Sequence, residues 1–296
     1  MAVVTTGFFD GVHLGHRKVI EKLVSSARER GEEAVLVTFR PHPRTVFQQD
    51  ARALRLLTSQ DEKERILRGL GVDRIELVRF TREFGALTAE EYLRDYVRDR
   101  FGAGAVVVGY DNRFGSDGVS GKALFALAGR LGLEVIPVSF ESDPSGQAVS
   151  STRIRTALSE GRVDEAAAML GRKYSLHGVV VEGNRLGRTI GFPTANMQLY
   201  EPLKLVPADG VYAVRTQVLG KTYKGVCNIG LRPTVGAGGA RTIETHILGF
   251  DQEIYGLDLD IEFCARLRDE RRFDSLELLK EQLCIDRKKA GEIVVV

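Results

Sequence analysis

The sequence has no tryptophan, only three cysteines and no long apolar run, and each of these absences narrows what the chain can be. No stretch approaches the roughly 20 consecutive apolar residues that a membrane-spanning helix needs. No basic and then apolar leader precedes the first motif. We therefore expect no membrane partner and a cytoplasmic location, while the oligomeric state stays open.

Cysteine pairs and charge of one sign are also lacking. The three cysteines, Cys227, Cys264 and Cys284, form no Cys-x-x-Cys pair, which argues against a disulfide framework and a zinc knuckle. The 42 basic residues are balanced by 40 acidic ones, for a formal net charge of +2. We expect no nucleic-acid partner, because that would need a broad basic field, and any phosphate chemistry must come from local arrangement.

What the sequence does contain is two halves with different hydrophobic periods. At 296 residues, two domains are expected. Up to about Gly171, β-branched runs such as AVVTT and EAVLVTF alternate with segments of helical spacing, which predicts βαβ units on a parallel sheet. After Tyr174, strand-like runs separated by Gly, Pro and Asn predict a small antiparallel barrel, and a helix follows from Ser275 onward. We place the domains at 1–171 and 172–296.

Two of only five histidines, His13 and His16, lie in GFFDGVHLGH, between a strand that ends near Thr6 and a helix with an apolar stripe from Val19. Open α/β sheets hold ligands at the carboxyl ends of their strands, and helix starts favour anions. Imidazoles at this place can donate hydrogen bonds to nucleotide phosphates and stabilise the charge that builds as pyrophosphate leaves. Taken alone, the pair could also be a metal pair or two solvated histidines.

GFFDGVHLGH resembles the signature of nucleotidyltransferases whose HxGH motif binds ATP, and in particular the FMN adenylyltransferase domain of bacterial bifunctional riboflavin kinase/FAD synthetases. TFRPHP (38–43), VGYDNRFG (108–115) and VSSTRIR (149–155) are similar to further motifs of that family in the same order. Asn112 stands where we expect an aromatic residue. The resemblance implies that ATP is contacted by Gly7, Phe9, His13, His16, Ser150, Ser151, Thr152 and Arg155. It also implies that His13, His16 and Asp111 are catalytic, and that Asp111 contacts the flavin.

GNRLGRTIGFPTAN (183–196) resembles the ATP and Mg²⁺ segment of riboflavin kinases. This resemblance implies that Gly187 and Thr194 contact ATP, and that Thr194 and Asn196 hold Mg²⁺. Neutral oxygen ligands suit this ion, which keeps several waters and uses the oxygens of the nucleotide. By itself, a glycine-rich turn would be common in any small barrel.

TIETHIL (242–248) resembles the strand that carries the catalytic glutamate of the kinase. A neutral hydroxyl nucleophile benefits from a positioned carboxylate that accepts its proton, so Glu244 is the expected general base. His246 lies two residues further on the same strand face and is expected to be a structural neighbour. Without the resemblance, Glu244 would be read as an ordinary solvated glutamate.

NIGLRPT (228–234) and LRDERRFDSLELLKEQL (267–283) are similar to the remainder of the kinase module, and Arg268 is expected to contact the flavin. The alternatives are a Gly-Pro turn for the first stretch and an amphipathic helix after a charged, solvated run for the second.

The resemblance implies an α/β Rossmann-like nucleotidyltransferase domain followed by a small antiparallel β-barrel riboflavin kinase domain with a C-terminal helix. The barrel would phosphorylate riboflavin to FMN, and the first domain would adenylylate FMN to FAD with release of pyrophosphate, each with ATP and Mg²⁺. The FMN phosphate is already anionic at neutral pH, so the second reaction needs no strong base. Two alternatives stay open, namely a chain in which only the kinase works and a flavin-binding regulatory protein without catalysis.

Overall fold

In the computed structural model the chain forms two compact units, residues 1–151 and 152–296. The structure describes residues 1–47, 54–110, 112–139, 146–183, 186–231 and 241–296. The division between the units lies at Ser151, the first residue of a helix. The functional boundary that we predict near Gly171 stays a prediction.

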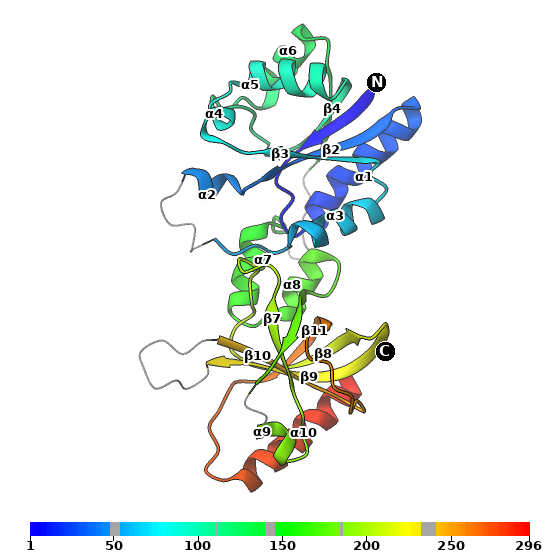
Figure 1. The fold of residues 1–296 in the computed structure, drawn as a ribbon. Coiled ribbons are helices and arrows are strands. Elements are labelled where there is room, and N and C mark those ends of the chain that lie inside the picture. The colour runs from blue at the N-terminus through cyan, green and yellow to red at the C-terminus, as the bar shows by residue number, and fades with distance from the viewer. Residues whose placement is uncertain (48–53, 111, 140–145, 184–185, 232–240) are drawn as a thin grey trace. The chain divides into compact units, whose positions relative to one another are not determined.

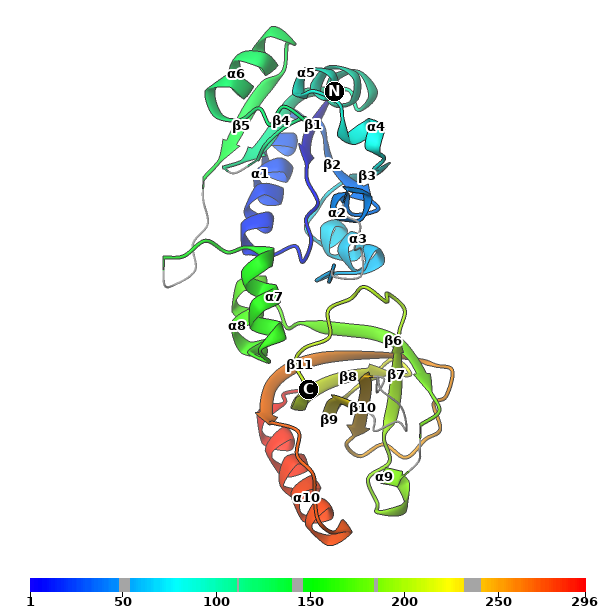
Figure 2. The ribbon, with the colours of Figure 1, turned by 90° about the vertical axis from the view of Figure 1, so that its left-hand side faces the viewer.

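The first unit is built on a five-stranded parallel sheet with the strand order β3-β2-β1-β4-β5 (Figures 1 and 2). Because the chain runs from β1 outward in one direction and returns on the other side through β4, the strand order reverses between these two strands. Such a switch point is where open α/β sheets hold their ligands. The strands are β1 (Ala2–Thr6), β2 (Glu33–Arg40), β3 (Arg74–Arg79), β4 (Ala103–Gly109) and β5 (Glu134–Val138).

Helices cover both faces of this sheet, as Figures 1 and 2 show. On one face, Ile20 and Leu23 of α1 and Leu67 of α3 pack with Val3 and Leu36 of the sheet. On the other face, the core is formed with η2 and α6. The helices are α1 (Leu14–Arg30), α2 (Pro43–Phe47), α3 (Gln60–Gly69), α4 (Arg82–Gly85), α5 (Ala89–Glu91), the π-helix η2 (Tyr92–Arg100) and α6 (Gly121–Arg130). The alternating βαβ pattern of the sequence is therefore confirmed.

The second unit contains a closed barrel of six strands, in the order β10-β7-β6-β11-β8-β9, in which all pairs are antiparallel. The predicted barrel is confirmed. Its strands are β6 (Ser175–Val181), β7 (Ala195–Leu199), β8 (Gly210–Val218), β9 (Lys221–Leu231), β10 (Arg241–Ile247) and β11 (Asp258–Arg268).

The described part of the second unit also contains the helices α7 (Ser151–Ser159), α8 (Val163–Leu170), α9 (Leu186–Thr189) and α10 (Leu276–Ile293). Ser275 caps α10 by accepting a hydrogen bond from the Leu278 N–H, which explains why the predicted C-terminal helix begins there. α10 packs against β8 and β9 through Ala290, together with Val294, which directly follows the helix (Figure 2). Among the described helices, none combines the length and the apolar composition needed to cross a membrane.

Two strands were not predicted. β3, with the sequence RIELVR, is an edge strand whose charged residues hide its period, and only Val78 is fully buried. β7 begins inside the PTAN motif, where the turn residues before it masked the short run ANMQL. In both strands the pairing with neighbours outweighs a weak local signal.

Candidate functional site

His13 and His16 lie at the carboxyl end of β1, beside the switch point of the sheet. His13 is the N-cap of α1, and its Nδ1 accepts a hydrogen bond from the His16 N–H at 3.3 Å. Because Nδ1 acts as an acceptor, a neutral His13 carries its proton on Nε2. α1 is capped at its C-terminal end by Gly31 in the left-handed conformation (φ 63°).

The two imidazoles are stacked on each other, with ring centroids 3.6 Å apart and planes 16° from parallel. Burial, together with the neighbouring His13 and Lys63, holds the pKa of His16 well below its usual value. His16 is therefore neutral at pH 7 and can donate a hydrogen bond without carrying a charge. Within the described residues its buried Nδ1 has no hydrogen-bond partner, which is the condition of a group that a ligand completes.

The other residues of the β1–α1 loop mainly hold its shape. Phe9 is 5% exposed and packs edge-on against His16 with ring centroids 5.2 Å apart, and Gly7 bonds to the Val37 carbonyl through its N–H. The carboxylate of Asp10 accepts hydrogen bonds from the N–H groups of Leu57 and Thr58. Asp10 is therefore fixed within the fold.

Next to this loop lies a cavity of about 320 Å³ with aromatic walls. Its rings come from β2, the β3–α4 region, η2 and the segment after β4, and they are Phe39, Phe80, Phe84, Tyr92 and Phe114. Several of these rings meet edge to face, for example Phe84 and Tyr92 with centroids 5.8 Å apart. The Tyr92 hydroxyl lies 2.7 Å from the Thr6 Oγ1, so the cavity begins at the end of β1. A flat apolar ring system with a few polar edges suits such walls.

Asn112 lines the same cavity at the position where the resemblance suggested an aromatic residue. Its side-chain amide donates a hydrogen bond of 3.4 Å to the Thr6 carbonyl at the end of β1. Asn112 therefore gives the cavity a polar edge where an aromatic residue would have given it ring surface. Asp111, which the sequence analysis placed among the catalytic and flavin-binding residues, lies outside the described residues.

The VSSTRIR motif is divided between the two units. Ser150 and Ser151 belong to the first, and the Ser151 hydroxyl donates to the Asp10 carbonyl at 2.9 Å, which ties the motif to the β1–α1 loop. Thr152 and Arg155 lie on α7 of the second unit. Their predicted contact with ATP stays a prediction.

In the barrel, three polar residues form a row across neighbouring strands. Glu244 of β10 is directly opposite Asn196 of β7 on one side and Asn228 of β9 on the other. Residues in direct antiparallel register point to the same face of a sheet, with Cβ atoms about 5 Å apart. A carboxylate therefore lies between two amides.

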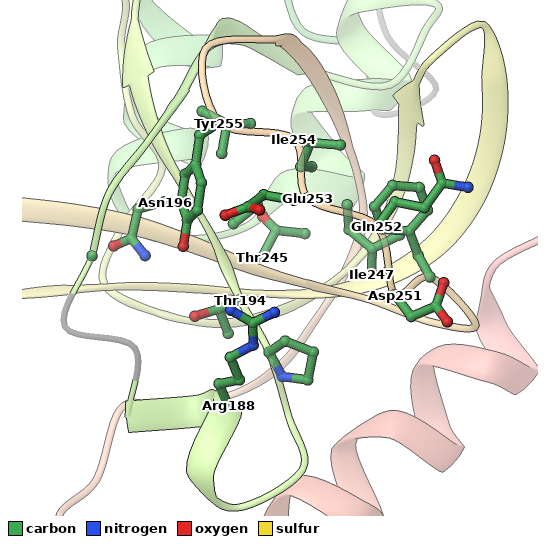
Figure 3. Close-up of a pocket in the computed structure, with 15 residues that line it drawn as sticks. Arg188, Thr194, Asn196, Thr245, Ile247, Asp251, Gln252, Glu253, Ile254 and Tyr255 are labelled. Atoms are coloured by element: carbon green, nitrogen blue, oxygen red, sulfur yellow. The ribbon is translucent and has the colours of Figure 1, made fainter.

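Two cavities of the barrel unit share Thr194. The first, of about 350 Å³, has apolar walls that include Phe192 and Leu283, and its polar lining includes Thr194 and Glu244. The second, of about 380 Å³, is drawn in Figure 3, where Arg188 and Thr194 lie on one side and Tyr255 on the other. Thr194 thus marks the place where the contents of the two cavities would meet.

His246 supports the segment that carries Thr194. Its Nδ1 lies 2.8 Å from the Pro193 carbonyl, and its ring packs against Phe192 with centroids 5.2 Å apart. Burial holds the pKa of His246 below its usual value, so the ring is neutral and donates this hydrogen bond through Nδ1–H. These contacts agree with the structural role that the sequence analysis expected for His246.

Arg268 lines the cavity of Glu244, and its guanidinium is bound by Asp286 of α10. Its Nε and Nη2 lie 3.0 and 2.8 Å from the Asp286 Oδ2, and Asp286 is 1% exposed. Arg268 therefore joins α10 to the cavity wall, and its predicted contact with the flavin stays a prediction. Gly187 lines the same cavity, and a Cβ there would lie 2.2 Å from the Phe192 carbonyl oxygen, so only glycine fits.

Comparisons with known proteins agree with this architecture. A family model described as FAD synthetase matches residues 1–153, and one described as Riboflavin kinase matches residues 170–294. The Bifunctional riboflavin kinase/FMN adenylyltransferase of Bacillus subtilis (strain 168) is 36% identical over 293 residues, which cover 98% of this chain and 91% of the relative. This chain belongs to the family of bifunctional riboflavin kinase/FMN adenylyltransferases. The family member of Escherichia coli (strain K12) is 38% identical over 292 residues, covering 98% of this chain and 92% of its own.

A crystal structure from Streptococcus pneumoniae has the same fold, with a TM-score of 0.92 and 35% identity. It covers 98% of this chain and 93% of that one, and it bears the name macrolide-efflux protein. The name is not carried over, because both family models and the curated relatives place this chain among the riboflavin kinase/FMN adenylyltransferases.

The donor set at the PTAN segment fits a small divalent cation. Thr194 offers a hydroxyl oxygen and Asn196 an amide oxygen, and both line the cavity of Figure 3. Hard cations prefer such oxygens, and Mg²⁺ takes few ligands from the protein when a nucleotide supplies others. Within the described residues, no group of three or more His, Cys, Asp or Glu side chains could form a metal site of its own.

Sequence reasoning missed two features of the site. The aromatic cavity is assembled from rings that are spread along the chain: Phe39 and Phe114 lie in the TFRPHP and VGYDNRFG motifs, but Phe80, Phe84 and Tyr92 belong to no motif that the sequence showed. Lys63 of α3 is 3% exposed, and its Nζ lies 3.2 Å from the Phe8 carbonyl oxygen. The only signal in the sequence was the helical spacing of Lys63 and Leu67, which are four residues apart. This spacing puts the lysine on the buried face of α3.

Proposed function

We propose that the chain makes FAD from riboflavin in two steps, one in each half. The barrel transfers the γ-phosphoryl group of ATP to riboflavin, and the α/β unit transfers the adenylyl group of a second ATP to the resulting FMN. Membership of the bifunctional family supports both activities. The observation that carries the residue-level proposal is that Glu244 and Thr194 line one cavity.

For the kinase, Glu244 is the general base. Riboflavin occupies the cavity with apolar walls, and the triphosphate of ATP approaches from the neighbouring cavity, so the two substrates meet at Thr194. The Glu244 carboxylate accepts the proton of the primary hydroxyl while the hydroxyl oxygen bonds to the γ-phosphorus and the bond to ADP breaks. Asn196 and Asn228 flank that carboxylate in register on either side, and the Asn228 amide donates a hydrogen bond of 3.4 Å to the Glu270 Oε1.

Mg²⁺ is the cation we assign to Thr194 and Asn196. When bound, it neutralises charge on the phosphates of ATP. The chain's contribution is to hold the two oxygen donors on a short segment that His246 anchors through the Pro193 carbonyl. Gly187, also assigned to ATP, lets α9 approach that segment closely.

For adenylyl transfer, His13 and His16 stabilise the departing pyrophosphate. An oxygen of the FMN phosphate bonds to the α-phosphorus of ATP as the bond to pyrophosphate breaks, and no proton needs to be removed from the nucleophile. His13 donates a hydrogen bond from Nε2. His16 also donates one, and because it is neutral it does not repel the neighbouring His13 ring electrostatically. The N-terminus of α1 adds backbone donors for the phosphates.

The isoalloxazine ring of FMN occupies the aromatic cavity beside the β1–α1 loop. Phe39, Phe84 and Tyr92 supply stacking and edge contacts, and Asn112 supplies a polar edge. Thr6 and Gly7 line this cavity next to the loop that carries the histidines, which brings the flavin phosphate toward the nucleotide. Gly7 and Phe9 belong to this loop, and the Ser151 hydroxyl is bonded to its Asp10 carbonyl, which supports roles in ATP binding for these residues and for Ser150.

The roles of Asp111, Thr152, Arg155 and Arg268 rest on the resemblance alone and are proposals. The domain boundary near Gly171, which rests on the change of hydrophobic period, and the cytoplasmic location are proposals as well.

The test is a time course of the purified chain with riboflavin, ATP and MgCl₂, in which FMN and FAD are separated by chromatography and pyrophosphate is measured. FMN is expected to rise and then be consumed as FAD and pyrophosphate appear in equal amounts. FMN without FAD would leave only the kinase. The absence of both products, with riboflavin bound, would favour the regulatory protein.

A further inference from the structure

The β1–α1 loop that carries the histidine pair has an unusual backbone. Phe9 and Val12 adopt positive φ angles of 50° and 40°, although neither is glycine. For residues with a Cβ, and above all for β-branched valine, this region is strained and persists only where the surroundings impose it. The loop therefore needs external contacts to keep its shape.

Lys63 and Thr38 supply such a contact to the peptide that precedes Phe9. The Lys63 Nζ donates to the Phe8 carbonyl at 3.2 Å and to the Thr38 Oγ1 at 3.1 Å, and the Thr38 hydroxyl donates to the same Phe8 carbonyl at 3.3 Å. The Phe8 ring is also covered, by the Lys63 ammonium 4.7 Å from its centroid and by the His42 ring at 3.8 Å. We call this triangle of Lys63, Thr38 and the Phe8 carbonyl the Phe8 clamp.

The segment that leads into α3 also holds the second half of the loop. Asp10 accepts from the N–H groups of Leu57 and Thr58, and the Gly11 N–H donates to the Thr58 Oγ1 at 3.1 Å. Both halves of the loop are therefore attached to the same stretch of chain, Leu57 to Lys63. A shift of this stretch would move Phe9, and with it the ring that packs on His16.

Burying the Lys63 ammonium costs free energy because the charged group loses its hydration. An apolar side chain of the same length would fill the same space without this cost. Burial lowers the pKa of Lys63 to about 8. The negative charges of Asp10 and Glu64 oppose this shift, whereas the positive charge of Arg40 adds to it. The charge of Lys63 also acts on His16, whose proton it disfavours. The position thus has two physical links to the histidine pair, one through the Phe8 carbonyl and one through space.

We propose that Lys63 is a positioning residue of the FMN adenylyltransferase site, which acts through the Phe8 clamp to fix the loop that presents His13 and His16. The proposal rests on the proposed function of that site. Lys63 itself touches neither substrate in this proposal. It sets the geometry of the donors, for which a displacement of about 1 Å can cost roughly 100-fold in rate.

The test compares Lys63→Met with Lys22→Met, an exposed lysine of α1 outside the site. Lys63→Met is expected to lower kcat for FAD formation from FMN by about 100-fold, with a smaller change in KM for FMN. Riboflavin phosphorylation, measured in the same preparation, is expected to stay within twofold, and Lys22→Met is expected to leave both activities unchanged. Loss of both activities in parallel with a lower melting temperature would reduce Lys63 to a structural role and overturn the proposal.

A second pair of variants tests the clamp without changing the charge. Thr38→Val removes the hydroxyl and keeps the shape, whereas Thr38→Ser keeps the hydroxyl. We expect about a tenfold loss of FAD formation in Thr38→Val, the value of one hydrogen bond, and recovery to within threefold of wild type in Thr38→Ser. Equal rates in the two variants would contradict the clamp, whether or not Lys63→Met folds.

A spectroscopic readout keeps the proposal separate from the activity. The chain has five histidines, so the imidazole ¹⁵N resonances can be assigned by substitution. In Lys63→Met those of His13 and His16 should move, while those of His177 and His246 in the barrel unit stay in place. Unchanged His13 and His16 resonances would overturn the positioning role. If wild type makes no FAD, the proposed function fails, and these resonances still decide whether Lys63 positions the pair.

Discussion

Glu244 lies directly opposite Asn196 in the antiparallel pairing of β10 with β7. The general base that we propose and one of the proposed cation ligands are therefore cross-strand neighbours, and their relative position depends on the register of one pair of strands. Thr194, two residues before Asn196, lines the cavity of Glu244 as well as the neighbouring one. Substitutions in this row should separate proton transfer from cation binding.

Glu244→Gln keeps the size of the side chain and removes the proton acceptor. We expect the kcat of riboflavin phosphorylation to fall by about 1,000-fold, within the range for the loss of a general base, while FAD formation from supplied FMN is unchanged. The measurement is FMN formation followed by chromatography. Glu262→Gln, in a half-buried ion pair with Arg215, is the matched control and should leave both rates within twofold. Loss of both activities in Glu244→Gln would contradict the division of labour.

Thr194→Val and Thr194→Ser form a pair that tests cation binding. Valine keeps the branched shape without the hydroxyl oxygen, so we expect the Mg²⁺ concentration for half-maximal kinase rate to rise by about tenfold or more. Serine retains the oxygen and should need less than threefold more Mg²⁺. The kinase rate is measured against MgCl₂ at fixed ATP. If both variants respond alike, the hydroxyl is not a ligand.

His16→Ala removes one of the two proposed donors of the adenylyl transfer site. By analogy with the loss of one preorganised donor, the kcat of FAD formation should fall by about 100-fold to 1,000-fold. Riboflavin phosphorylation should not change, because His16 belongs to the other unit. His177→Gln, on the surface of the barrel, serves as the control for both assays. Pyrophosphate release at the wild-type rate in His16→Ala would rule out this role.

The lowered pKa of Lys63 predicts how stability depends on pH. Between pH 8 and 10.5 the unfolded chain still holds a proton on Lys63 that the folded chain has released, so the contribution of this residue to stability rises with pH across that window. The difference between the ordinary pKa of 10.5 and the folded-state pKa of about 8 corresponds to about 3 kcal/mol in the free energy of unfolding. Below pH 8 the residue is charged in both states and its contribution is constant.

Urea unfolding of wild type and Lys63→Met, followed at several pH values from 7.5 to 10.5, measures this effect. The difference in the free energy of unfolding should shift in favour of wild type by up to about 3 kcal/mol across the window. Lys22→Met should show no such trend relative to wild type. A constant difference between wild type and Lys63→Met would mean that the ammonium is not buried in the folded chain.

The local patterns of this sequence determined much of its structure by themselves. The change from alternating βαβ runs to successive strands gave the two architectures, because side-chain periods of 3.6 and 2.0 are properties of single elements. Short-range hydrogen bonds also follow from the sequence, as at Ser275, which caps α10. Even the location of His13 and His16 at a strand end followed from the order of a β-branched run and a helical stripe.

Only the tertiary structure decided which distant residues meet. Lys63 lies 55 positions from the Phe8 carbonyl that it bonds, and the rings of the aromatic cavity come from four separate segments. The register that sets Glu244 between Asn196 and Asn228 depends on strand pairing, in which a shift of one residue turns every side chain to the other face. These contacts arise from the burial of apolar faces and the closure of the barrel, which act on the whole chain at once and leave no periodic trace in any one segment.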